Sequence, residues 1–169
     1  MRRSILVIIA LILFAGFSSR VLAHDQYITT TFDNFIGQQY THEDEDPFKG
    51  YLSVNVTNNT SRDWTDFHFE IIDVGWDVSN VDFIDTPGYE PNSTQGPLTW
   101  VIDNSVVGAT LDLYFASDPV LVGESATFDV YTDNTIGQQF FGVLLYPTPE
   151  PATIALLGLG ALVLLRKRK

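Results

Sequence analysis

Apolar and polar residues alternate in several short stretches between residues 27 and 146. Residues 52–57 read LSVNVT and residues 66–71 read DFHFEI, with apolar side chains at every second position. The same alternation returns at residues 111–115 and 126–131. A period of two is typical of β-strands that bury one face and expose the other. We therefore predict strands in these four stretches.

Less regular strands are predicted at residues 27–31, 38–41, 80–84, 98–102 and 139–146. The segments between the runs are rich in Asn, Asp, Gly, Pro and Ser, which favour turns. No stretch in the middle of the chain has a helical period. The pattern predicts an all-β fold, an antiparallel β-sandwich of immunoglobulin- or fibronectin-like type with eight or nine strands. The long loop at residues 85–97 is expected at one end of this sandwich.

The first 23 residues have the pattern of a secretory signal peptide. Arg2 and Arg3 precede an apolar stretch at residues 5–17, and cleavage is expected between Ala23 and His24. Export by the Sec machinery follows from this prediction. The chain contains no cysteine, so an exported domain must be stable through core burial alone. We expect three parts: a signal peptide (1–23), an acidic β-sandwich (24–147) and a terminal segment (148–169).

The charge of the middle part is strongly negative. Residues 24–148 hold two basic residues, Lys49 and Arg62, against 20 of the 21 acidic residues, for a formal charge of −18. Such a field repels phosphate backbones and anionic lipid, so we exclude nucleic acid as a partner. The same field attracts cations, so calcium binding by the acidic run at residues 43–46 stays a possibility. The run lacks the spacing of an EF-hand loop, and we expect a solvated loop there.

The histidines are the candidate metal ligands. Cleavage after Ala23 makes His24 the N-terminus, where an amine and a ring nitrogen can bind copper together, as in lytic polysaccharide monooxygenases. His42 and His68 are the available partners, although the sequence around His24 matches no copper-protein pattern. His68 is expected to be a partly exposed strand residue. No nucleophile or paired-carboxylate site stands out, so we predict neither an enzyme nor a bound cofactor.

The end of the chain combines three features. Pro149, Glu150 and Pro151 precede an uncharged stretch, residues 152–165, which four cations follow. As a helix its 14 residues would be about 21 Å long, whereas a comfortable span needs about 20 residues. The predicted anchor positions are Ala152, Leu156, Leu159, Leu162 and Leu165, and the basic stop is Arg166, Lys167, Arg168 and Lys169. The stretch could be a short permanent anchor or a temporary stop during processing.

This order of motif, short apolar stretch and basic end strongly resembles the PEP-CTERM sorting signal. Proteins with this signal carry an N-terminal signal peptide and are handled in Gram-negative and related bacteria by exosortase, a membrane-embedded transpeptidase-like enzyme. The resemblance implies export, tethering to the membrane through the tail, and cleavage near Pro149–Pro151. It also implies that the chain is a substrate of exosortase and not a catalyst.

The expected function is that of a cell-surface or matrix protein with a structural or adhesive role. Many proteins with this signal are linked to exopolysaccharide and biofilms, so exopolysaccharide is an expected partner. A carbohydrate-binding module is the leading alternative, and a copper oxidase using His24 is the enzymatic one.

Overall fold

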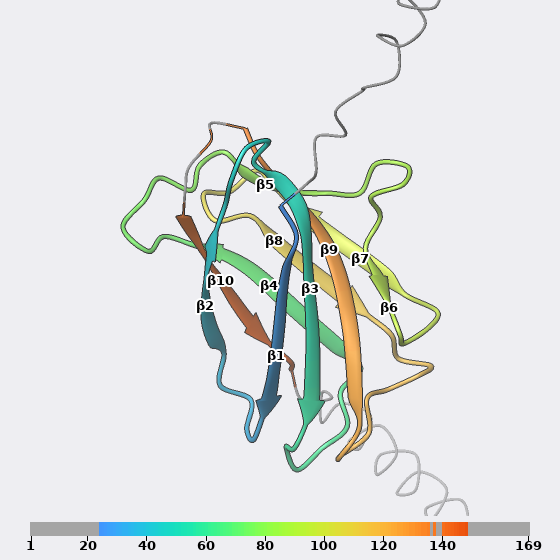
Figure 1. Ribbon diagram of the computed structural model, residues 1–169. Helices are drawn as coiled ribbons and strands as arrows, with labels where there is room; N and C mark the ends of the chain where they lie inside the picture. Colours follow the sequence, from blue (N-terminus) through green and yellow to red (C-terminus); the bar gives the residue numbers. More distant parts are fainter. Residues whose placement is uncertain (1–23, 136, 138–139, 149–169) are drawn as a thin grey trace, which may run out of the picture.

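The computed structural model describes residues 24–135, 137 and 140–148. These residues form ten β-strands and no helix, so none of them lies in a helix that could cross a membrane (Figure 1). The strands are β1 (Gln26–Phe32), β2 (Gln38–Glu43), β3 (Lys49–Asn58), β4 (Asp66–Ile72), β5 (Val81–Ile84), β6 (Asn92–Ser93), β7 (Thr99–Asp103), β8 (Thr110–Tyr114), β9 (Ser125–Asn134) and β10 (Phe140–Tyr146). The predicted signal peptide, Pro149–Pro151, the apolar stretch and the basic stop lie outside the described residues.

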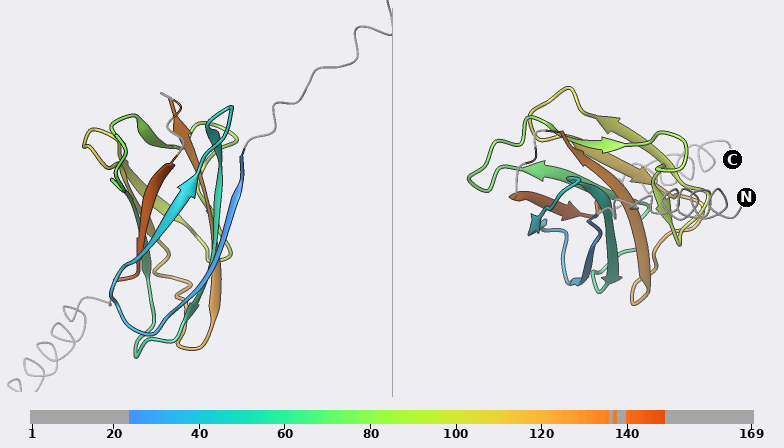
Figure 2. Two further views of the ribbon diagram at one scale, coloured as in Figure 1. Left: turned by 60° about the vertical axis from the view of Figure 1, so that its left-hand side comes forward. Right: turned by 45° about the horizontal axis from the view of Figure 1, so that its top comes forward.

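The strands form two five-stranded sheets that face one another (Figures 1 and 2). Sheet A has the order β1-β3-β9-β5, with β6 also paired to β9, and sheet B has the order β2-β10-β4-β8-β7. The all-β, two-sheet prediction is confirmed. The prediction of a wholly antiparallel sandwich is wrong at β1, which runs parallel to β3. A parallel pair needs a crossover connection, and the chain supplies one by placing β2 in the opposite sheet.

The core lies between the sheets and is built from the alternating apolar positions. In β4, for example, Phe67, Phe69 and Ile71 are buried, and the residues between them face outward. Phe67 stacks on Phe128 of the facing sheet, with ring centroids 4.9 Å apart. Trp64 is fully buried against Phe32 and Phe67. In this cysteine-free chain, the packed aromatic rings supply the apolar burial that stabilises the sandwich.

The segment predicted as a loop at one end runs along the edge of sheet A instead. β5 pairs with the last residues of β9, and β6 pairs with Asp129 and Phe128 further back along the same strand. The two short strands therefore form one broken edge beside β9. The two-residue strand β6 lies inside the predicted loop and has no alternation long enough to reveal it.

β1 and β2 are outer strands of the two sheets, one in each. β1 begins the order of sheet A and β2 begins that of sheet B. A short turn at residues 33–37 joins them, so the chain passes from one sheet to the other at the open side of the sandwich (Figure 2). Side chains from both strands can therefore meet there.

Candidate functional site

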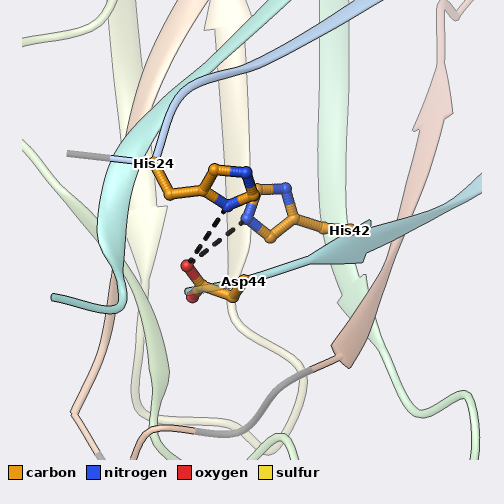
Figure 3. Close-up of side chains that lie close together, drawn as sticks. All are labelled: His24, His42 and Asp44. Atoms are coloured by element: carbon orange, nitrogen blue, oxygen red, sulfur yellow. Dashed lines mark ion pairs between the residues drawn. The ribbon is translucent and has the colours of Figure 1, made fainter. Parts of the chain in front are cut away.

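Two of the three histidines meet at this open side. His24 lies two residues before β1, His42 lies in β2, and Asp44 directly follows β2 (Figure 3). Asp44 Oδ1 lies 3.9 Å from His24 Nδ1 and 3.7 Å from His42 Nε2. One ligand atom from each of the three residues lies within 4.8 Å of the others. The cluster thus joins the edges of the two sheets.

The ring of His42 is held by a neutral partner. Its Nδ1 contacts Oε1 of Gln26, whose amide nitrogen donates to the carbonyl of Thr41. Because an amide oxygen only accepts, Nδ1 must carry the proton and donate it. In the neutral ring, Nε2 then has a free lone pair that points toward Asp44. Below the ring lies Phe141, with centroids 4.6 Å apart.

Asp44 is buried, with 2% of its surface exposed. Its Oδ1 accepts a hydrogen bond from the amide of Glu45, and its Oδ2 accepts one from the side chain of Asn134. The expectation of a solvated loop at residues 43–46 is therefore wrong for Asp44, although its neighbours are exposed. The alternation of β2 continues past its end and turns Asp44 to the same side as His42.

His24 is fixed by its backbone. Its nitrogen donates to the carbonyl of Lys49 at 3.1 Å, and the neighbouring Asp25 accepts from the amide of Tyr51. A Cβ on Gly50 would lie 1.9 Å from the His24 carbonyl oxygen, so only glycine allows this approach. The ring is one-third exposed, yet its Nδ1 is shielded and has no hydrogen-bond partner among the described residues.

His68 lies elsewhere, on the outer face of sheet B. It alternates with the buried residues Phe67 and Phe69, whereas His42 points inward with its cross-strand neighbour Phe141. His68 Nδ1 lies 2.6 Å from Asp112 and Nε2 lies 3.5 Å from Asp66. The copper hypothesis named both histidines as partners of His24, and the structure brings only His42 to it.

The carboxylates determine the charge of His68. Burial alone would lower the pKa of His68, but hydrogen bonds and charges of Asp66 and Asp112 outweigh it and raise that pKa. Burial likewise opposes ionisation of Asp66, but the nearby His68 and the hydrogen bonds from Thr148 override it and lower the pKa of Asp66. His68 is therefore held as a cation by the carboxylates of Asp66 and Asp112.

Asp66 also holds the last described residue. It accepts hydrogen bonds from the amide of Thr148 at 3.1 Å and from its hydroxyl at 2.7 Å. Pro149, the first residue of the predicted sorting motif, follows Thr148 in the sequence. The β-sandwich thus fixes the point from which the motif continues.

A groove of about 520 Å³ runs over the outer face of sheet A. Tyrosines, carboxylates and small polar groups share its lining, which consists of Asp25, Tyr27, Tyr51, Ser53, Glu90, Asn92, Thr127 and Asp129. Tyr27 is 77% exposed. Burial, followed by the nearby Tyr89 and Asp25, raises the pKa of Tyr51, which keeps its hydroxyl a hydrogen-bond donor. No sequence pattern had marked this groove, because its residues come from four separate segments.

The three tryptophans do not form a shared aromatic surface for a sugar. Trp64 is in the core, Trp100 packs partly against it, and Trp76 is about half-exposed near Phe140. The exposed aromatic side chains of the groove are tyrosines.

Comparison with known proteins identifies the end of the chain. The model of the PEP-CTERM protein-sorting motif matches residues 147–169. No curated protein and no solved structure matches the chain. The predicted sorting motif is confirmed, and it supports a protein that is exported and targeted to exosortase.

Proposed function

We propose that this chain is an exported bacterial surface or matrix protein that exosortase processes at its tail. The observation that carries the proposal is the PEP-CTERM protein-sorting motif at residues 147–169. Its role is structural or adhesive, in an exopolysaccharide or biofilm setting, and the chain is a substrate of the sorting enzyme rather than a catalyst. The tail tethers the chain to the inner membrane through a helix at residues 152–165, with Arg166–Lys169 on the cytoplasmic side.

Several features support this proposal. The sequence begins with a signal-peptide pattern and ends with the motif, as expected for a chain that enters a membrane for processing. Asp66 binds Thr148, the residue before Pro149, so the β-sandwich holds the chain directly before the sorting tripeptide. The two five-stranded sheets also support the immunoglobulin- or fibronectin-like relationship, which stays part of the proposal.

The test is the intact mass of the protein from each fraction of cells that export it. We expect a product that begins at His24, ends near Pro149–Pro151 and lies outside the inner membrane. A variant with alanine at Pro149, Glu150 and Pro151 should keep Lys169 and stay in the membrane. Val107→Ala, at an exposed loop position, is the matched control and should be processed normally. A wild-type product that retains Lys169 in the membrane would make the tail a lasting anchor and contradict processing.

A carbohydrate-binding function is the second candidate, and the groove on sheet A favours it. Sugar rings pack on aromatic faces, and their hydroxyls bond to carboxylates and amides, which are the groups that Tyr27, Tyr51, Glu90 and Asn92 offer. The formal charge of −18 at residues 24–148 disfavours anionic polymers. We therefore expect neutral or amino-sugar glycans as ligands.

Calorimetry with neutral and amino-sugar oligosaccharides tests this second candidate. Tyr51→Ala should abolish binding, because the ring lines the groove and its hydroxyl donates to the Gly88 carbonyl of the covering loop. Tyr114→Ala removes an exposed tyrosine from sheet B, away from the groove, and should change nothing. Equal binding by both variants would exclude the groove.

A further inference from the structure

We propose that His24, His42 and Asp44 bind one divalent transition-metal ion of the zinc and copper type. The three residues present a ligand atom each within 4.8 Å of one another, and Asp44 Oδ1 faces one nitrogen of each ring (Figure 3). The proposal concerns the side chains of the folded domain and goes beyond the sorting function.

The donor set selects the class of metal. Two imidazole nitrogens and one carboxylate oxygen suit zinc, copper and nickel, whereas calcium takes six to eight oxygen ligands. Bonds of about 2.1 Å in a tetrahedral site place ligand atoms about 3.4 Å apart. The two distances to Asp44 Oδ1, 3.9 Å and 3.7 Å, exceed this by a few tenths of an ångström. The three ligand atoms lie within 4.8 Å of one another, so the two ring nitrogens must approach each other by up to about 1.4 Å to complete a tetrahedral site.

The hydrogen bond at the other ring nitrogen of His42 is of the kind found in metal sites. A metal-bound imidazole donates its other ring N–H to an oxygen, which fixes the ring and its tautomer. Gln26 provides that oxygen for His42, and its own amide is held by the Thr41 carbonyl. The remaining nitrogen, Nε2, is the one that faces Asp44. The ring is therefore set for binding before a metal arrives.

The buried charge of Asp44 and the shielded nitrogen of His24 point to a missing cation. A buried carboxylate is costly unless a positive charge or a metal compensates it. Among the described residues, no lysine or arginine lies within ion-pair distance of Asp44, and Lys49 pairs with Asp133 instead. His24 Nδ1 is shielded and without a hydrogen bond among the same residues. A metal ion would satisfy both groups at once.

The position of the site gives the metal a structural role. His24 belongs to the edge of sheet A and His42 to the edge of sheet B. A metal bound by both would tie the two sheets together at the open side of the sandwich. In a chain without cysteine, such a link takes the place that a disulfide has in other exported domains.

The experiment is zinc and copper titration of the chain purified from cells that export it, without a polyhistidine tag. The protein is stripped with chelator and titrated by calorimetry in excess calcium, which occupies the weak carboxylate sites. We expect one zinc ion per chain. Pulsed electron paramagnetic resonance, which distinguishes imidazole from amine nitrogen, should show two imidazoles bound to copper(II). At 100 times the dissociation constant, zinc should stabilise the fold by about 2.7 kcal/mol.

His24→Gln is the main variant, because His24 lies at the partly exposed edge and its loss leaves the core intact. It should weaken zinc binding at least tenfold and remove one nitrogen from the copper spectrum. Gln26→Ala should weaken binding about tenfold through the loss of ring orientation. His68→Gln is the matched control and should bind as the wild type does, since that ring belongs to another cluster.

Two outcomes would overturn the proposal. In the first, the wild-type chain binds no stoichiometric zinc or copper in the presence of calcium. In the second, His24→Gln binds as tightly as the wild type, and the cluster is then an ion pair of histidines with Asp44. Circular dichroism of each variant confirms that the fold is retained.

Discussion

Two histidine clusters of this molecule have similar composition and opposite chemistry. His68 lies on an outer face with a carboxylate near each ring nitrogen, Asp112 at Nδ1 and Asp66 at Nε2. His42 lies inside, with a neutral amide at Nδ1 and a carboxylate at Nε2 that it shares with His24.

The comparison shows that the partners of the two ring nitrogens decide what a histidine can do. Two carboxylates stabilise the imidazolium, which has no lone pair for a metal. At His42 the neutral amide fixes the proton on Nδ1, and in the neutral ring Nε2 keeps a lone pair that faces Asp44. The same residue type is thus a charge in one cluster and, in the proposed metal site, a ligand in the other.

The largest expected difference between the two clusters is in the stability contributed by the aromatic residue that packs on each histidine ring. His42 packs on Phe141, which is 1% exposed, and His68 stacks on the half-buried Tyr146. Phe141→Ala should cost about 3–5 kcal/mol of unfolding free energy, because it opens a cavity in the core. Tyr146→Ala should cost about 1 kcal/mol, a typical value for a point mutation. Urea denaturation of both variants measures this. Equal costs would contradict the placement of His42 on the core.

A smaller effect is expected at the bond between Asp66 and Thr148. Thr148→Val removes the hydroxyl donor but keeps the amide bond, and should cost about 1 kcal/mol. Hydrogen exchange should become faster at the end of β10, where the chain approaches the sorting motif. Thr148→Ser keeps the hydroxyl and is the control. If the serine variant loses as much as the valine variant, the hydroxyl does not hold this end.

The smallest effect is the pH dependence of the His68 cluster. The pKa of His68 is raised in the folded state, so its stabilisation is fully present below the unfolded pKa of 6.5. It is lost as the pH rises through the folded pKa. The wild type should therefore exceed His68→Gln by up to about 1 kcal/mol in the acidic range, and the difference should shrink toward alkaline pH.

Unfolding free energies of both chains between pH 5 and 9 test this prediction, in a range chosen so that Asp66 does not interfere. The pKa of Asp66 is lowered from 3.8, so its contribution is lost only as the pH falls below that value. A difference between wild type and variant that stays constant with pH would show that the ring contributes by packing alone.

The strands were predictable because their signal is local. Alternation at residues 52–57 and 66–71 marks the buried face whatever the partner strand is. The parallel pairing of β1 with β3 was not predictable, since partner and direction depend on distant segments. β6, with two residues, is too short to show a period.

The site was predictable only in part. The position of His24 at a cleavage junction singled it out, and His42 was one of two possible partners. Asp44 was missed because a run of four acids is typical of an exposed loop. The spacing of two residues between His42 and Asp44 was the available signal, as it places both side chains on one face of an extended chain. Gln26 carries no signal of its own, and only the fold brings it to His42.

The histidine cluster and the sorting motif lie at opposite ends of β10. His42 pairs with Phe141 near the start of β10, and Thr148 lies past its far end, seven residue steps later. At about 3.3 Å per residue, this separates the histidine cluster from the sorting motif by about 23 Å. In the proposed pathway, the tail tethers the chain to the membrane, and the histidine cluster lies at the end of the domain that is distant from the tail. Metal ions from the surrounding medium can then bind at the proposed site while exosortase still holds the tail.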